Sequence, residues 1–568
     1  MTYNLRTYFK KNVSGVDYIA LLLSCIFISS NFSISFCQNI PKGLVRRNCG
    51  GQLIVSISSK QVNTFSINNY TTRLQLEGYL YAQLDSSLNI GDTLFHYFNL
   101  GPKYRNKHLQ IKGVTNQNKS YKKHRDENLS FKDLRKKQIQ IVKQAENNGY
   151  PFAQIRLDSI LVTDSTVFAD LILDPGPLFS FDSITLHGDV KIKPSFLSRF
   201  LAIKPDEPFS QRKVENAAIY LKELAFLQTS KPDLIFAEEK AKMILPLKAR
   251  KANQADGVLG LMNNANGNGR VLITGELNIN LNNLLQTGKR LHLHYRRFNI
   301  NAQTVEFNYY HPVLIGPIDS KLDFSLLRQD TSFLNVSRQI SLFVRSAGTT
   351  LGIFSGLMTS RRLSSTISPQ SLSFDNYIYG FTYEWKNLND FFMPRKGQKI
   401  FGRFSAGNKT VLEEIPPQSN FRINNSQFSF DFKIENYVTK KRATVFSSLA
   451  LGKIYNNTNT YFLGDYYRFG GLKSLRGFNE NNFFSSSYII SNLEYRIYTE
   501  ESSYIFLFYD QGVLDNRSKI DYPLGFGPGI SFKSNFGIFN FVFAMGRSND
   551  QNLSLNLAKF HFGYFSQF

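Results

Sequence analysis

From about residue 255 onward, the chain alternates between apolar and polar positions. The alternating segments are roughly ten residues long and are separated by turns rich in Asn, Gly and Ser. Examples span residues 271–281, 290–298, 337–345, 427–434 and 536–545. A tilted strand needs about nine to eleven residues to cross a bilayer, and it presents alternate side chains to lipid. At roughly 20 residues per strand and turn, residues 255–568 are predicted to form an all-β transmembrane barrel of about 16 antiparallel strands.

The preceding part of the chain has a different pattern, because it contains an internal repeat. The segment GYLYAQLD from Gly78 recurs as GYPFAQIRLD from Gly149, and GPKY from Gly101 recurs as GPLF from Gly176. The two pairs recur at a spacing of about 71 to 75 residues, which indicates successive copies of one small domain.

Each copy combines helices and strands. A strand that ends in Gly precedes one or two helices and two final strands, as at residues 131–147, where apolar residues at helical spacing stop at Asn148-Gly149. In the third copy, we expect the first strand, the main helix and the last strand at residues 181–186, 210–226 and 243–247. We therefore predict α+β repeats at residues 45–100, 101–175 and 176–250, ahead of the barrel at residues 255–568.

Residues 1–37 have the pattern of an export signal. Basic residues precede an apolar run of about eleven residues, and small residues follow it. The run is shorter than the roughly twenty residues of a membrane-spanning helix, so we expect a cleaved signal peptide. A lipoprotein is the alternative, since Leu22-Leu23-Ser24-Cys25 loosely resembles a lipobox.

The charge and the cysteines narrow the class of protein. The formal net charge is +24, which suggests an anionic neighbour, and export favours a membrane surface over nucleic acid. After removal of the signal, Cys49 is the only cysteine, which excludes a disulfide framework and a cysteine-based metal site. We expect the protein to lie in the outer membrane of a Gram-negative bacterium, with the repeats in the periplasm.

A soluble β-sandwich or β-helix would also show alternation, but the aromatic residues favour a membrane barrel. The chain has 51 Phe and 29 Tyr, as expected of a lipid-facing band with aromatic girdles. Its last segment is also alternating, and a final strand that closes on the first would explain this pattern. The aromatic positions concerned are Phe560, Phe562, Tyr564 and Phe568.

The most informative segment is FGGLKSLRGFNE at residues 469–480. It places Arg476 between bulky apolar residues, with Gly470 and Gly471 before it and Gly477-Phe478 after it. Here the chain resembles the superfamily of outer-membrane assembly and secretion barrels that includes BamA and TamA, in which a long loop folds into the lumen with an Arg-Gly-Phe tip. The final aromatic positions and the repeats resemble the sorting signal and the POTRA domains of that superfamily. Further matches are NLEYR at residues 492–496, FYDQG at residues 508–512, which ends at Gly512, and Asp390 with Pro394 and Gly397.

A guanidinium inside a barrel requires carboxylate partners, because an unpaired buried charge is strongly unfavourable. Strand parity places Glu494 and Asp510 on faces opposite to their neighbours Tyr495 and Tyr509. We therefore predict that Asp510, Glu494 or both anchor the arginine of the loop. We also expect the glycine that follows this arginine to allow close backbone approach, and Phe478 to wedge the loop against the wall.

Signals of other chemistry are weak. His292 and His294 alternate on one strand face, but no third ligand is evident, so we expect wall side chains rather than a metal site. No helix pattern follows GFGPG at residues 525–529, so we expect a glycine-eased strand rather than a phosphate-binding loop. No nucleophile elbow is present, and the carboxylates of the barrel show no pairing signature beyond the two predicted to anchor the arginine, so we predict neither an enzyme nor a cofactor.

The resemblance covers nearly the whole mature chain, and three repeats with about 16 strands look more like TamA than like the longer-armed BamA. It implies insertion or translocation of unfolded outer-membrane clients, received by the repeats and released through a lateral seam among outer-membrane lipids. It also implies a possible TamB-like partner in the inner membrane. One alternative is a two-partner-type secretion pore, which typically has two repeats and a plug helix. Another is a passive porin, which needs no repeated arm.

Overall fold

The structure is a computed structural model, and part of the chain is described in it. The predicted signal peptide at residues 1–37 and Phe568 lie outside the described residues. These residues are 45–49, 52–58, 67–90, 93–113, 125–127, 131–163, 166–263, 271–297, 302–329, 333–363, 372–390, 393–412, 424–457, 461–462, 464–500, 502–515, 519–534 and 537–566.

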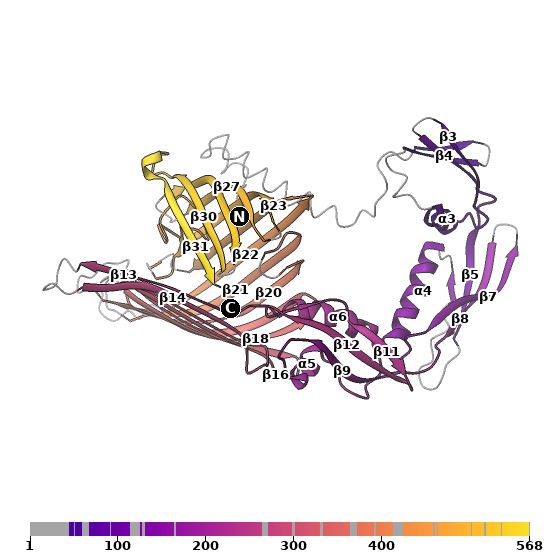
Figure 1. The fold of residues 1–568 in the computed structure, drawn as a ribbon, viewed down its shortest axis with the longest axis horizontal. Coiled ribbons are helices and arrows are strands. Elements are labelled where there is room, and N and C mark those ends of the chain that lie inside the picture. Colours follow the sequence, from indigo (N-terminus) through magenta and orange to yellow (C-terminus); the bar gives the residue numbers. More distant parts are fainter. Residues whose placement is uncertain are drawn as a thin grey trace.

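Sixteen antiparallel strands form one sheet that curls into a nearly closed barrel (Figure 1). The predicted barrel is confirmed, with its first strand starting at Gln254. A two-residue strand, β28 (Ile520–Asp521), pairs with the edge of β27. The sixteen strands are β13 (Gln254–Asn263), β14 (Val271–Leu284), β15 (Lys289–Arg297), β16 (Gln303–Ile315), β17 (Ile318–Gln329), β18 (Phe333–Ser346), β19 (Thr349–Arg362), β20 (Phe374–Leu388), β21 (Gly397–Val411), β22 (Asn424–Lys440), β23 (Ala443–Asn456), β26 (Ser487–Tyr498), β27 (Tyr504–Asp515), β29 (Leu524–Ser534), β30 (Gly537–Arg547) and β31 (Lys559–Ser566).

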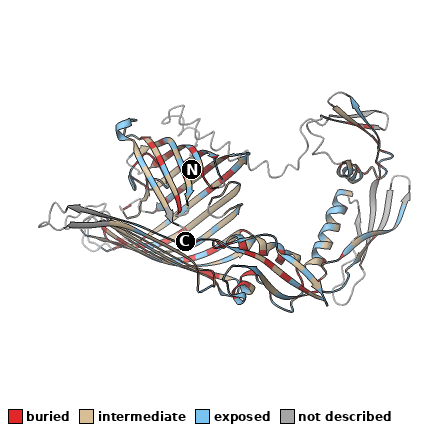
Figure 2. Ribbon diagram, viewed as in Figure 1, coloured by how far each residue is buried: buried red, intermediate tan, exposed pale blue. Residues whose placement is uncertain are grey.

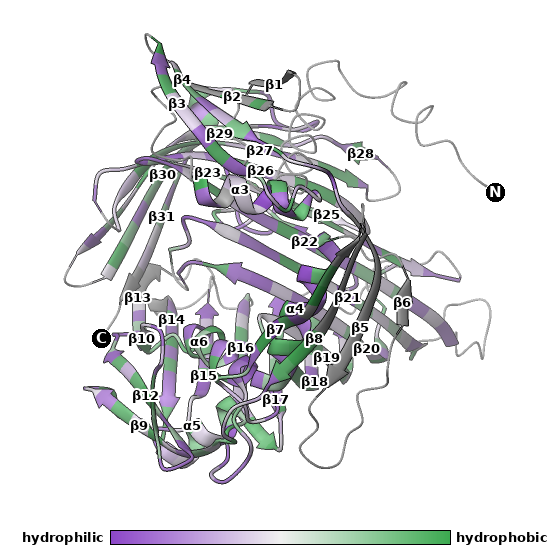
Figure 3. Cartoon of the chain, turned by 90° about the vertical axis from the view of Figure 1, so that its right-hand side faces the viewer, coloured by the Kyte–Doolittle hydropathy of each residue, from purple (hydrophilic) through white to green (hydrophobic). Residues whose placement is uncertain are grey.

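Alternation along the strands sorts side chains between the two faces of the barrel wall, as Figure 3 shows by the change of hydropathy from residue to residue. On β20, Tyr377, Tyr379 and Phe381 are exposed on the outer face. Several strands are longer than the ten residues expected, and β22 has 17. Buried residues recur in β23, β26, β27 and β30, in the part of the barrel that Figure 2 shows with red segments.

The barrel has a seam between its first and last strands. β13 pairs with β14, and β31 pairs with β30, in continuous antiparallel registers. β13 and β31 approach one another, but among the described residues no backbone register joins them. The sheet is therefore hydrogen-bonded all the way round except at this line.

Three small α+β units precede the barrel and form an arm (Figure 1). The first two have sheets with the strand orders β1-β2-β4-β3 and β6-β5-β8-β7. The elements of the first unit are β1 (Val45–Cys49), β2 (Gln52–Ser58), α3 (Ile67–Leu76), β3 (Gln83–Ile90) and β4 (Thr93–Asn99). Those of the second are β5 (Arg105–Gly113), β6 (Arg125–Glu127), α4 (Phe131–Glu146), β7 (Gln154–Thr163) and β8 (Thr166–Asp174).

The third unit has the largest core of the arm. Its central strand β12 pairs with β9 on one side and with β10 and β11 on the other. Its elements are β9 (Ser180–Gly188), α5 (Pro194–Leu201), α6 (Gln211–Lys222), β10 (Leu227–Thr229), β11 (Asp233–Ala237) and β12 (Lys240–Ala249). The assignment of the three units as POTRA domains, with the boundaries given above, stays a prediction.

The main helix predicted for the third unit, at residues 210–226, extends too far at its C-terminal end. α6 ends at Lys222 rather than at Phe226, because Leu224, Ala225 and Phe226 enter the core as a turn before β10. Apolar spacing alone does not distinguish a last helical turn from such a buried turn. No helix among the described residues is long and apolar enough to cross a membrane.

The repeated Gly-Tyr and Gly-Pro segments lie at the joints between units. The backbone oxygen of Gly78 accepts a hydrogen bond from Tyr104 N at 2.8 Å, and that of Gly149 accepts one from Phe179 N at 2.7 Å. The second joint has an additional bond, because Asn147 Oδ1 accepts from the backbone N of Arg212 at 2.8 Å, near the start of α6. The sequence repeat therefore reflects a repeated contact between neighbouring units.

Candidate functional site

The long connection between β23 and β26 lies against the inner face of the barrel wall. We call residues 464–486 of this connection the inward loop. It contains a small hairpin of β24 (Tyr467–Phe469) and β25 (Phe483–Ser485), and the glycine-rich motif lies between these two strands. The hairpin therefore holds the two ends of the motif together and presents its middle, Arg476, to the wall.

Arg476 makes side-chain hydrogen bonds to both predicted carboxylates. Its Nε and Nη2 donate to Oδ2 and Oδ1 of Asp510 at 2.8 and 2.6 Å, and its Nη1 donates to Oε1 of Glu494 at 2.6 Å. The backbone N–H of Arg476 also donates to Asp510 Oδ2 at 3.0 Å. Arg476 is 5% exposed and Asp510 is 0% exposed. Such a two-point contact away from water fixes the orientation of the guanidinium, so the loop tip is bound to β26 and β27.

Neighbouring side chains complete the surroundings of this pair. Arg496 Nε donates to Glu494 Oε2 at 2.8 Å, so this carboxylate lies between two guanidinium groups. Asn492 Nδ2 donates to Asp510 Oδ1 at 2.9 Å. The guanidinium carbon of Arg476 lies 3.8 Å from the centre of the Phe508 ring, a cation–π contact. Two cations and two carboxylates therefore balance one another on the inner wall.

The motif glycines lie where the loop approaches other backbone. Gly477 has a φ of 92°, and a Cβ there would lie 2.8 Å from the backbone N of Gly546 on β30. Gly470 and Gly471 follow β24 with φ of 125° and 82°. Gly512 lies on β27, where a Cβ would be 2.9 Å from the ring of Pro523.

Phe478 packs in an apolar cluster beneath the loop tip. Its side chain is fully buried, and its ring centre lies 4.8 Å from that of Phe483. The cluster combines loop residues with residues of the wall strands β26 and β27, so the loop shares a core with the wall. Its members are Phe469, Leu475, Phe478, Phe483, Ile490 and Leu514.

Two contacts of the inward loop were not found from the sequence. Gly477 N donates to His561 Nε2 at 3.2 Å, which connects the loop tip to the last strand, β31. Lys409 on β21 forms a buried ion pair with Asp465, and its Nζ lies 4.1 Å from the ring centres of Phe374 and Phe462. The loop is therefore held at its base by Lys409 and at its tip by β26, β27 and β31.

The other predicted residues lie apart from this site. Phe560 and Phe562 are exposed on the outer face of β31, and Tyr564 is partly buried there. His292 Nδ1 lies 2.6 Å from Asn280 Oδ1, and His294 Nε2 lies 2.9 Å from Glu276 Oε1, so both histidines contact neighbouring strands. The role of the final aromatic residues in sorting stays a prediction.

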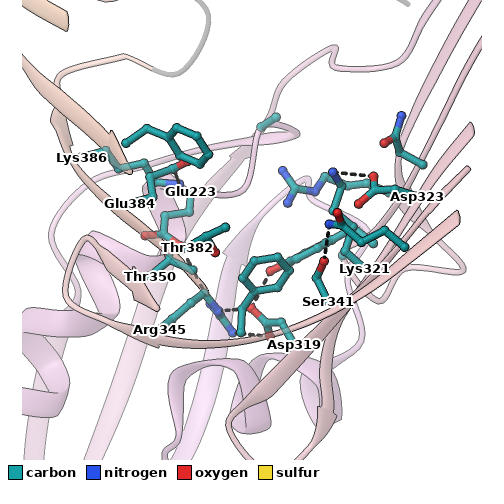
Figure 4. Close-up of a pocket in the computed structure, with 18 of the residues that line it drawn as sticks. Glu223, Asp319, Lys321, Asp323, Ser341, Arg345, Thr350, Thr382, Glu384 and Lys386 are labelled. Atoms are coloured by element: carbon teal, nitrogen blue, oxygen red, sulfur yellow. Dashed lines mark hydrogen bonds and ion pairs between the residues drawn. The ribbon is translucent and has the colours of Figure 1, made fainter. Parts of the chain in front are cut away.

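A second cluster of charged residues lies where the third unit meets the barrel, around a cavity of about 600 Å³ (Figure 4). Arg345 on β18 donates through Nε and Nη2 to Asp319 on β17, at 2.5 and 3.2 Å. The same carboxylate accepts from the hydroxyl of Tyr310 at 2.5 Å and from Val313 N at 2.7 Å. The guanidinium carbon of Arg345 lies 4.0 Å from the ring centre of Phe200 on α5. One arginine thus joins the barrel rim to the arm.

Other contacts extend this joint. Arg250 donates two hydrogen bonds to Asp390, at 3.0 and 3.2 Å. Asp390 is one of the residues on which the family resemblance rests, and its carboxylate binds the arm here. Val313, near the C-terminal end of β16, belongs to the core of the third unit. Glu223 lies 4.0 Å from Arg345, and burial raises the pKa of Glu223, while Lys386 and Arg345 oppose this shift.

Comparisons with known proteins identify the family of the barrel. Residues 359–568 match the model of the Omp85 superfamily domain. The barrel carries an Omp85 superfamily domain. The matched residues run from within β19 to the end of the chain and include Arg476 and both of its carboxylate partners. The resemblance to the superfamily of BamA and TamA is confirmed, whereas the closer likeness to TamA stays a prediction.

Two solved structures with TM-scores above 0.5 share the fold of this chain. CdiB from Acinetobacter baumannii is 12% identical, with a TM-score of 0.53 over 82% of this chain and 91% of that chain. CdiB from Escherichia coli is 13% identical, with a TM-score of 0.51 over 90% of this chain and 97% of that chain. BamA from Haemophilus ducreyi lacking POTRA domains 1–3 is 16% identical, with a TM-score of 0.43 over 82% of this chain and 100% of that chain. No curated protein sequence matches the chain.

The ion pair of Arg345 with Asp319, at the joint between arm and barrel, lies ahead of the matched Omp85 domain and gives a first prediction. Arg345→Ala leaves the buried Asp319 without its cation, which costs about 3 to 5 kcal/mol when one partner of a buried pair is removed. We expect the third unit to detach more often from the barrel, so that trypsin cleaves after Lys251 more than about tenfold faster. Arg199→Ala, which removes an exposed arginine from α5 of the same unit, should leave the cleavage rate unchanged. Equal cleavage of both variants would contradict a structural role for Arg345.

Proposed function

We propose that this outer-membrane β-barrel inserts other proteins into the outer membrane. The seam between β13 and β31 carries the proposal, because the described residues show no hydrogen-bonded register there. A strand edge with unpaired N–H and C=O groups is a template for a strand of another chain. An unfolded client strand that pairs with such an edge could leave the barrel sideways into the surrounding lipids.

The position of the inward loop supports this proposal. Its tip contacts β26 and β27 through Arg476, and β31 through His561. These strands lie on one side of the seam, and β13 on the other side pairs only with β14 among the described residues. The loop therefore braces one side of the seam and leaves the other side free to move.

The arm supplies a way to receive clients. In the second unit, β7 is an edge strand of its sheet, and its residues Ile160 and Leu161 are exposed. An extended apolar client segment could add to such an edge by backbone pairing. We propose that the arm lies in the periplasm, captures unfolded outer-membrane proteins in this way, and has a TamB-like inner-membrane protein as a possible partner. Outer-membrane lipids surround the barrel, and neither an enzymatic step nor a cofactor is part of the proposal.

A dedicated secretion pore is the second candidate, because the two CdiB structures share the fold of this chain. Three α+β units favour an assembly factor, since two-partner transporters are expected to have two repeats and a plug helix. A passive porin is less well supported, because the seam and the arm would have no role in it.

A disulfide across the seam tests the proposal. One cysteine would be placed between Val258 and Leu261 on β13 and another at Phe562 on β31, with Cys49 replaced by Ser. We expect the oxidised protein to lose client insertion and the reduced protein to regain it, measured as the levels of folded barrels in the outer membrane by quantitative proteomics.

A control disulfide at Ser355 and Tyr379, which pair across β19 and β20, should not affect insertion. Normal insertion by the seam-locked protein would rule out the lateral route. Loss of one exported protein, with normal levels of outer-membrane barrels, would favour the secretion pore.

A further inference from the structure

Three large apolar side chains are exposed in one loop of the barrel. Leu553, Leu555 and Leu557 are 47%, 73% and 43% exposed. They lie in residues 548–558, which connect β30 to β31, at the end of β31 opposite to its C-terminus (Figure 1). Single exposed leucines are common on protein surfaces, but three at alternate positions of a short loop form an apolar patch that requires an explanation.

The loop that carries these leucines is held in place by hydrogen bonds. Asn549 donates from its backbone N to Asp521 at 2.9 Å and from its side chain to Ile520 O at 2.8 Å, which ties the loop to β28. Gln551 Nε2 donates to Gly546 O at 3.0 Å. Ser554 caps a short 3-10 helix at residues 555–557 by accepting from the N of Asn556. The leucines are therefore presented by an ordered turn.

The strand count fixes the end of the barrel at which the loop lies. β13 starts next to the arm, and the sixteen strands alternate in direction, so β30 ends on the side opposite to the arm. The inward loop also enters the barrel from this side. In a membrane barrel whose arm lies in the periplasm, this is the side of the outer leaflet.

The start of β31 places the loop next to the lipid-facing outer face of the barrel. β31 begins at Lys559, directly after the loop. Phe560, the first outward residue of β31, is 84% exposed, so the apolar outer face reaches the very start of the strand. Leu557 lies only three positions before Phe560 in the chain. The leucines thus continue the lipid-facing band of β31 beyond the end of the strand.

We propose that Leu553, Leu555 and Leu557 insert into the hydrocarbon of the outer leaflet, next to the seam. The ligand of this surface is the acyl chains of membrane lipids. Burial of the three side chains in lipid removes their apolar area from water. The insertion anchors the β30–β31 hairpin in lipid, and it does not depend on which clients the protein handles.

Site-directed spin labelling tests the proposal with the full chain in phosphatidylcholine vesicles. A single cysteine at Leu555, with all three native cysteines replaced by Ser, would carry the label. We expect collisions with oxygen, which concentrates in hydrocarbon, to exceed those with a water-soluble nickel complex several-fold. Leu553→Cys and Leu557→Cys should give the same result, and they provide further positions should one labelled variant fail to fold.

Asp550→Cys is the matched control, because Asp550 lies in the same loop and its side chain is 84% exposed. There we expect the nickel complex to collide more often than oxygen. Equal accessibility to the nickel complex at positions 550 and 555 would overturn the proposal, because the leucines would then lie in water. Low accessibility to both reagents at position 555 would also overturn it, because another protein surface, such as a second copy of the chain, would then cover the loop.

Discussion

Arg476→Ala is expected to release the inward loop and to destabilise the barrel by about 3 to 5 kcal/mol, the usual effect of removing one partner of a buried ion pair. The variant loses the hydrogen bonds to Asp510 and Glu494 and leaves the completely buried Asp510 carboxylate with Asn492 as a side-chain donor. The free energy of unfolding can be measured with urea in lipid vesicles. Trp385 on β20 is the only tryptophan of the chain and reports the transition by fluorescence.

Two further variants separate the role of the charge from that of the geometry. Arg476→Lys keeps the positive charge but cannot donate two parallel hydrogen bonds to Asp510, so we expect it to recover only part of the stability. Lys473→Ala removes an exposed cation from the same loop and should change the stability by less than about 0.5 kcal/mol. Wild-type stability of Arg476→Ala would mean that the arginine does not anchor the loop.

The arginine and its partners could be found from the sequence because each constraint acts over a short stretch of chain. The alternation in β26 and β27 places Glu494 and Asp510 on the inner face, and the glycines around Arg476 mark a loop that packs closely against other backbone. Neither constraint requires knowledge of the strand order. The family resemblance placed the arginine loop in the lumen, and the local pattern then selected the two carboxylates that face it.

The other contacts depend on distances that the sequence does not contain. Lys409 and Asp465 are 56 residues apart, and no motif surrounds either of them. Arg345 and Asp319 lie near strand ends, where charged residues usually face water, but here Arg345 packs against Phe200 of α5 and Tyr220 of α6. The strand lengths were underestimated for a related reason, since alternation continues past the bilayer and nothing in the sequence marks where the lipid ends.

Gly525→Ala is expected to destabilise the protein by about 1 to 3 kcal/mol, as is usual for an added methyl group in a packed site. Gly525 lies on β29, and a Cβ there would be 1.9 Å from the backbone oxygen of Arg476. A backbone atom cannot move aside as a flexible side chain can. The loop tip must therefore move away from the wall, which weakens the bonds of Arg476 to Asp510 as well. The urea transition of Trp385 measures this change too.

Gly402→Ala is the matched control, because Gly402 also lies within a barrel strand, β21, and no atom lies within 4 Å of the position of its added Cβ. Alanine has fewer conformations than glycine in the unfolded chain, so this variant should be unchanged or more stable by up to about 1 kcal/mol. If both variants lost the same stability, the cost would come from alanine in a strand rather than from the loop. A large loss at position 525 alone would show that the contact between β29 and the backbone of Arg476 holds the inward loop in place, in addition to the ion pair.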